Sequence, residues 1–222
     1  MKGVLPRYAP FVREIEAAAS GRHRASDVFV DACHMMALSI WSALCFGEAR
    51  RKAEADYMAT ASKYDAGEMA HICEAFAALV EALTDKREEF LGHCLERCFE
   101  ATAREKGQFL TPVSLSHMMG RMLAPEPRDE VIKLHDPCCG AGVLLVEGAE
   151  AHLEKGWKQR NLCVVASDID CRACDMAYVQ LSLLGYAGVV QQADALALKA
   201  LGPARYTPGW YLHQFPMRGI AA

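Results

Sequence analysis

Apolar residues recur at intervals of three and four along the first half of the chain. This spacing places them on one face of a helix and predicts amphipathic helices over residues 26–45, 65–83 and 85–107. Asp65 and Glu68 have the spacing of a helix-capping box. Asp85 and Glu88 repeat that spacing and would start the third helix, which Gly107 would end. We expect four or five helices in this half.

Strand and helix patterns alternate after residue 107. Short apolar runs, each followed by a turn, predict three strands, and the segments around them have helical spacing. The expected strands are 131–135, 162–167 and 188–192, and the expected helices are 111–123, 141–155 and 171–185. Such alternation is typical of right-handed βαβ units with a parallel sheet. The sequence therefore predicts an α-helical domain over residues 1–106 and an α/β domain over residues 107–222.

An acidic residue stands at the end of each predicted strand. Asp136, Asp168 and Asp194 follow the first, second and third strands. Ligands of parallel sheets bind beyond the carboxyl ends of the strands, where a carboxylate can accept hydrogen bonds from a ribose. Gly140 and Gly142 would let the backbone turn tightly and approach a ligand. The alternative is an ordinary turn with helix-capping acids, but three acids at successive strand ends favour a ligand site.

Composition and charge narrow the classes of function. Apolar residues make up 52% of the 222 residues and charged residues 23%, as in a globular protein with a core. The net charge is −4, so the chain has no overall basic field, and any DNA contact needs a local patch or a partner.

Cysteine use and hydropathy predict a cytoplasmic protein. No run of about 18 consecutive apolar residues occurs, and the ten cysteines do not form the framework of a small secreted domain. Cys171 and Cys174 have CxxC spacing but no matching second pair. Reduced, packed thiols are therefore favoured over a zinc or redox site, and we expect no metal.

Five segments resemble, in order and spacing, the amino-terminal half of the N6-adenine DNA methyltransferases, in particular the modification subunits of type I restriction systems. These segments are "GQFLTP" (107–112), "DPCCGAG" (136–142), "SDID" (167–170), "AYVQLSLLG" (177–185) and "ADAL" (193–196). The resemblance covers roughly residues 86–196.

The resemblance implies a Rossmann-like sheet and S-adenosylmethionine as cofactor. It also assigns cofactor-binding positions, grouped by the part of the cofactor that they would meet: Phe109, Thr111 and Pro112 for the methionine end; Asp136, Pro137, Gly140 and Gly142 for the loop beneath the cofactor; Asp168 for the ribose; and Asp194 for the adenine amine.

The segment that presents the target base is not found. The family holds a flipped-out adenine with an Asn-Pro-Pro-aromatic segment after the fourth strand. This sequence has no Pro-Pro pair, and its one asparagine, Asn161, precedes the second predicted strand. No catalytic residue is therefore assigned, and we expect a truncated, incomplete version of the fold. Its first strand would become an edge that invites pairing, covered by residues 204–217, by the helical half, or by a second chain in a homodimer or hetero-oligomer.

Three functions follow from these observations. The first is an S-adenosylmethionine-binding protein of the adenine-specific family, which transfers a methyl group to DNA adenine if it is active. The second is a non-catalytic module that binds the cofactor or a partner protein and regulates or completes another methyltransferase. The third is a structural helical protein with an empty α/β half. Cofactor binding separates the third from the first two, and methyl transfer to DNA separates the first from the second.

Overall fold

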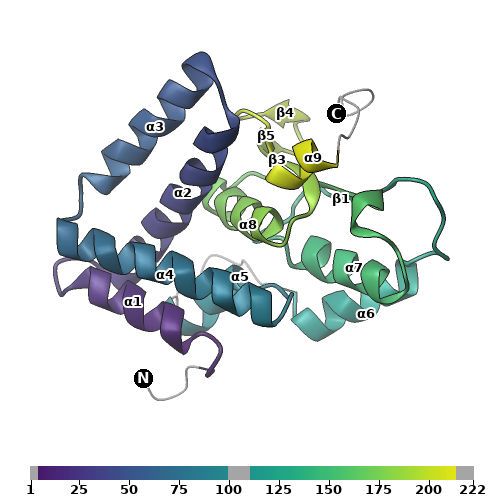
Figure 1. Cartoon of the computed structure of the whole chain (residues 1–222), viewed down its shortest axis with the longest axis horizontal. Helices are drawn as coiled ribbons and strands as arrows, with labels where there is room; N and C mark the ends of the chain where they lie inside the picture. The colour runs from purple at the N-terminus through teal and green to yellow at the C-terminus, as the bar shows by residue number, and fades with distance from the viewer. Residues whose placement is uncertain (1–4, 100–110, 214–222) are drawn as a thin grey trace.

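A computed structural model describes residues 5–99 and 111–213 of the chain (Figure 1). The helices of the first half are α1 (Ala9–Ala19), α2 (Ala25–Leu44), α3 (Gly47–Ala61) and α4 (Ala66–Asp85). α1 packs against α4, and α2 packs against α3. Phe11 meets Phe29 and Phe90 edge to face in their core, with ring centroids 5.7 and 5.6 Å apart. The capping box predicted at Asp65 and Glu68 is confirmed at the start of α4.

The predicted third helix is wrong at its start. α4 continues through Asp85, and the helical conformation resumes only at α5 (Leu91–Cys94), followed by a π-helical turn, η1 (Leu95–Phe99). The Glu88 carboxylate does not cap this helix, because it forms ion pairs with Arg7 and Lys86. Glu89 takes the capping role instead. Its carboxylate accepts hydrogen bonds from the backbone amides at the start of α5, with a Gly92 N to Oε1 distance of 2.5 Å. The expected end at Gly107 lies outside the described residues.

The second half contains the predicted parallel sheet. Its strands β1 (Ile132–Asp136), β2 (Leu162–Asp168) and β3 (Ala187–Asp194) lie side by side in chain order. The connections are α7 (Val143–Glu154) and α8 (Cys171–Leu183), and α6 (Val113–Leu123) precedes β1 and packs against α7. All six predicted elements from residue 111 to residue 192 are confirmed to within two residues at each end. The molecule is therefore a mixed α/β fold whose five-stranded sheet is mainly parallel.

The chain after β3 returns to the sheet at its β3 side. β4 (Lys199–Ala200) and β5 (Arg205–Tyr206) both pair with β3 in antiparallel orientation. The Thr207 hydroxyl is buried, donates to the Tyr186 carbonyl and accepts from the Gly188 amide. α9 (Pro208–Leu212) then packs so closely that a Cβ on Gly209 would lie 2.6 Å from the Tyr186 carbonyl oxygen.

β1 is an edge strand, since β2 is its only strand neighbour among the described residues. The expectation that residues 204–217 cover this edge is wrong for residues 204–213, which pack against β3, and residues 214–217 lie outside the described part. The described helices of the first half do not cover it either, because they pack mainly on α8. There His34 of α2 forms a 2.7 Å contact from Nδ1 to the Asp175 carboxylate. A second chain stays a prediction, as does a contact by residues 214–217.

α2 is the one described helix whose length and composition would allow it to cross a membrane. In this structure it packs against α1, α3 and α8, and 44% of its most apolar window is buried. A buried core helix and a membrane span can share this composition, so the hydropathy of α2 does not by itself indicate a membrane span.

Candidate functional site

The loop after β1 is shaped by its two glycines and by Asp136. The Asp136 carboxylate accepts a hydrogen bond from the Cys138 amide at 3.0 Å, which closes the first turn of the loop. Gly140 and Gly142 have φ angles of 54° and 95°, in the left-handed region that side chains disfavour. Gly142 immediately precedes α7. The backbone therefore reverses at the strand end within a few residues.

Asp168 fastens this loop to the end of β2. One of its carboxylate oxygens accepts from the Gly140 amide at 2.8 Å, and the other accepts from the Asp170 amide at 2.9 Å. The Cys139 amide also donates to the Ser167 carbonyl at 2.9 Å. The first two predicted strand ends are thus one hydrogen-bonded unit. The Asp168 side chain is half-buried, so the loop is held without enclosing this carboxylate completely.

Asp194 stands at the end of β3, one strand beyond Asp168 in the sheet. Its carboxylate accepts hydrogen bonds from the Leu196 and Ala197 amides, at 3.0 and 2.9 Å, and caps the turn that follows. In the parallel register Asp136 pairs with Ala166, and Asp168 pairs with Gln192. The three acids therefore lie along the same end of three adjacent strands, as the sequence predicted.

A family model described as N-6 DNA Methylase matches residues 86–200, which is just over half of the chain. The chain belongs to the N-6 DNA methylase family. A search of curated proteins finds no match. Residues 86–200, here called the methylase module, contain the β1 loop and all three strand-end acids, and methyltransferase is the class of function that the family indicates.

The "GQFLTP" positions are only partly described. Phe109 lies outside the described residues. Thr111 is half-buried and Pro112 is the N-cap residue of α6. Pro112 lines a cavity of about 910 Å³ between the α4–α5 connection, α6 and α7. Asp136, Asp168 and Asp194 are not among the residues that line this cavity. The structure thus places the three acids along one end of the sheet and Pro112 beside a cavity that none of them lines.

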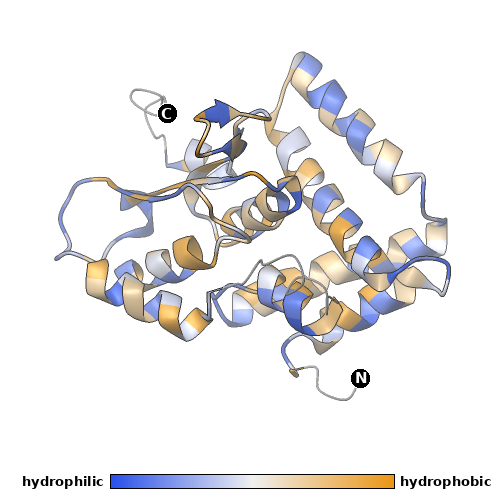
Figure 2. Cartoon of the chain, turned by 180° about the vertical axis from the view of Figure 1, so that it is seen from behind, coloured by the Kyte–Doolittle hydropathy of each residue, from blue (hydrophilic) through white to orange (hydrophobic). Residues whose placement is uncertain are grey.

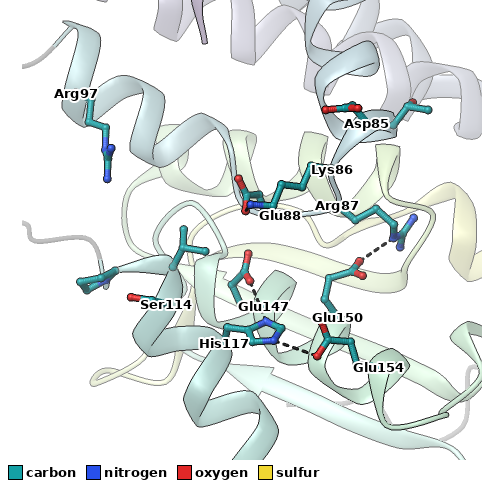
Figure 3. Close-up of a pocket in the computed structure, with 13 residues that line it drawn as sticks. Asp85, Lys86, Arg87, Glu88, Arg97, Ser114, His117, Glu147, Glu150 and Glu154 are labelled. Carbon is teal, nitrogen blue, oxygen red and sulfur yellow. Dashed lines mark hydrogen bonds and ion pairs between the residues drawn. The ribbon is translucent and has the colours of Figure 1, made fainter. Parts of the chain in front are cut away.

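This cavity is lined by charged side chains from α7 and its neighbours (Figure 3). His117 of α6 lies between two carboxylates of α7, 3.3 Å from Glu147 and 3.1 Å from Glu154. Arg87 pairs with Glu150 at 2.8 Å. Burial raises the pKa of Glu147 above its usual value, against the opposing effects of its hydrogen bonds. The ion pairs join α6 and the α4–α5 connection to the outer face of α7.

A buried polar cluster beneath the loop was not predicted from the sequence. The Gln180 side chain of α8 is fully buried and its Nε2 donates to the Ala141 carbonyl in the loop at 2.9 Å. The same Nε2 donates to Glu89, while Oε1 accepts from the Phe90 and Leu91 amides at 2.6 and 3.0 Å. The signal in the sequence was a glutamine within the apolar helix 177–185, where an unpaired amide would be costly.

Two of the cysteines at the loop, Cys139 and Cys174, are buried. Burial raises the pKa of Cys139 well above its usual range and raises that of Cys174 to about 12. Cys171 is exposed, while the Cys174 thiol lies 3.5 Å from the Asp168 carbonyl. Within residues 5–99 and 111–213, no group of three or more His, Cys, Asp or Glu side chains is arranged to hold a metal ion.

Proposed function

We propose that the three strand ends of the methylase module bind S-adenosylmethionine and that the protein acts on DNA adenine with the N6-adenine methyltransferases. The observation that carries the proposal is the hydrogen-bonded unit of the glycine loop and Asp168, next to Asp136 and Asp194, in a chain of this family. The sheet would then be Rossmann-like, with a helical domain over residues 1–106 before it. A cytoplasmic location and a role in restriction and modification are parts of the same proposal.

The residues at this site fit that cofactor. Each carboxylate oxygen has more than one lone pair, so Asp168 and Asp194 keep acceptor capacity beyond their backbone hydrogen bonds. Asp168 would accept from the ribose hydroxyls and Asp194 from the adenine amine. Gly140 and Gly142 have no Cβ, so the backbone at these two positions can approach the ligand closely. Asp136 and Pro137 would set the start of that loop, and Phe109, Thr111 and Pro112 would flank the methionine end.

When bound, the cofactor supplies an electrophilic methyl group on a sulfonium. The chain's part would be to hold the cofactor rigidly so that the methyl group faces its acceptor, which is the proximity effect. Gln180 and Asp168 serve this purpose, because they fix the loop from below and from the side. In a transfer to the adenine N6, the bond between the sulfonium and the methyl carbon would break as the bond to nitrogen forms, leaving the demethylated thioether and releasing one N6 proton. No residue of this chain is assigned a role in presenting the adenine.

A non-catalytic, cofactor-binding module is the second candidate. One observation favours it. The Thr-Pro-Gly-Trp segment at 207–210 is used to pack α9 against β3. Such a module would regulate or complete another methyltransferase, and the β1 edge would take a strand from that partner or from a second chain. The net charge of −4 supports a partner for DNA contact, because the chain itself has no overall basic field.

Calorimetric titration with S-adenosylmethionine and with its demethylated product tests the shared part of both candidates. We expect binding of both ligands, at least tenfold weaker for Asp136→Ala and for Asp168→Ala. Asp129→Ala is the matched control, since Asp129 is an exposed acid in the α6–β1 connection. Absence of heat at millimolar ligand, or equal affinity for all four proteins, would overturn the proposal. Thermal unfolding of each variant shows whether a lost affinity comes from a lost fold.

Transfer of a tritiated methyl group to unmethylated DNA separates the two candidates. A protein that binds the cofactor and labels DNA is an enzyme. A protein that binds the cofactor and leaves DNA unlabelled, alone and at high concentration, is the binding module.

A further inference from the structure

α6 turns its small residues toward the protein and its large apolar residues toward solvent. Ser116 and Gly120 form the buried face, and a Cβ on Gly120 would lie only 2.8 Å from the Gly148 Cα of α7. The opposite face has five large side chains that are each between 38% and 77% exposed. These five residues, called here the α6 stripe, are Leu115, Met118, Met119, Met122 and Leu123. α6 lies on the side of the molecule seen in Figure 2.

The α6 stripe has the spacing of a packed helix face. Its members fall at positions i, i+3, i+4, i+7 and i+8, which in a globular protein normally face the core. Their exposed surface is on the order of 500 Å², as large as the largest patches found on monomeric proteins, and such patches are often functional. Methionine side chains are flexible and polarizable, so they adapt to an apolar partner surface. The stripe therefore has the character of an interface.

We propose that the α6 stripe is the contact surface for a second copy of this chain, with the two α6 helices packed across a two-fold axis. A two-fold contact requires a patch that complements itself. The stripe meets this requirement, since it consists only of leucine and methionine and brings no like charges together. Two copies would bury about 1,000 Å² from the stripes alone, which reaches the threshold for a specific interface before the flanking residues are added.

The free edge of β1 is a poorer surface for a second copy. Lys133 and His135 are both exposed, and alternate residues of a strand point to the same face. Antiparallel pairing of β1 with β1 of another copy, centred on Lys133, would set the two lysine charges opposite each other, and like charges directly opposite each other destabilise a strand pair. The α6 contact avoids this repulsion and leaves the β1 edge available to a different protein.

Sedimentation equilibrium of the purified full chain, over a hundredfold range of concentration, tests the proposal. The wild type should reach twice the 24.4 kDa mass of the chain. The double variant Met118→Glu/Met122→Glu should stay at the monomer mass, because each copy would then bring two carboxylates into the contact. Met58→Glu is the matched control, since Met58 is 63% exposed on α3, and it should behave as the wild type.

Circular dichroism keeps the result interpretable. Substitutions at exposed positions should leave the helix content unchanged, and Met118→Ser/Met122→Ser offers a neutral pair if the glutamates unfold the chain. A wild type that stays monomeric at the highest concentration would overturn the proposal, and would point to another part of this chain or a different protein as the cover of the stripe. A dimer that persists in both double variants would overturn it as well.

Discussion

Replacing Gln180 with methionine removes the amide that joins the α4–α5 connection to the β1 loop while preserving nearly the same side-chain volume. In the wild type the Gln180 Oε1 accepts from the Phe90 and Leu91 amides, and its Nε2 donates to Glu89 and to the Ala141 carbonyl. Gln180 is completely buried, so no water replaces these contacts. The substitution leaves two backbone N–H groups, one carbonyl and the Glu89 carboxylate without this partner.

The expected loss is a large share of the stability of a domain. Each buried polar group that loses its partner costs about 1–3 kcal/mol. Two amides alone therefore cost about 2–6 kcal/mol, and the apolar side chain recovers on the order of 1 kcal/mol through its own burial. A net loss of about 1–5 kcal/mol stands against a total free energy of unfolding of about 5–15 kcal/mol.

Urea unfolding followed by circular dichroism measures this loss. Gln192→Met is the matched control, because the Gln192 Nε2 donates to the Ile169 carbonyl in an exposed contact that water can replace. That control should lie within about 0.5 kcal/mol of the wild type. If the free energy of unfolding of Gln180→Met is also within 1 kcal/mol of the wild-type value, the buried amide does not contribute the stability assigned to it. The affinity of the variant for S-adenosylmethionine should fall too, since Ala141 belongs to the loop.

Two further predictions concern the backbone of the loop and the acid stability of the helical half. Gly142→Ala should destabilise the protein by about 1–2 kcal/mol in urea unfolding, because φ is 95° at this residue. Gly148→Ala within α7 is the control, since a Cβ there would have no other atom within 4 Å, and it should be neutral or stabilising. Hydrogen bonds from Arg22 and Ser20 lower the pKa of Glu68 from 4.5 to about 2. As the pH falls, the unfolded chain binds this proton first, so the stabilisation is complete above pH 4.5 and disappears toward pH 2. Thermal unfolding of Glu68→Gln should therefore depend less on pH than that of the wild type between pH 4.5 and pH 2. An identical pH dependence of the two proteins would refute this assignment.

The sequence was sufficient to predict the elements from residue 111 to residue 192, because their signals are local. Each strand is a short apolar run and each connection is a helix closed by a turn, so the βαβ order needs no information from distant residues. The acids at the strand ends follow from that order, since parallel strands bring their carboxyl ends to one edge. The bonds that Asp168 forms across to the loop and forward to Asp170 depend on loop geometry that the residue types do not specify.

The wrong start of the third predicted helix and the missed contacts of Gln180 have a common cause. Both depend on residues that are distant in the sequence. Asp65 and Glu68 have the same spacing as Asp85 and Glu88, yet only the first pair forms a capping box. Arg7, about 80 positions away in the chain, pairs with Glu88 and donates to the Lys86 carbonyl. A rule based on the spacing of nearby residues does not take such a distant partner into account. Gln180 was missed for the same reason, because its partners lie about 40 and 90 residues before it.

α6 shows where hydrophobic periodicity stops being informative. The pattern predicts a helix with an apolar face, and the ordinary assumption is that this face packs inward. Close approach of two helices is decided by the size of the side chains between them, and Gly120 faces Gly148 across the α6–α7 contact. The face with small residues therefore packs against α7, and the leucines and methionines are exposed to solvent. The residues that correctly predict the helix therefore do not show which of its faces is packed, and their exposure is what makes a second copy of the chain the expected partner.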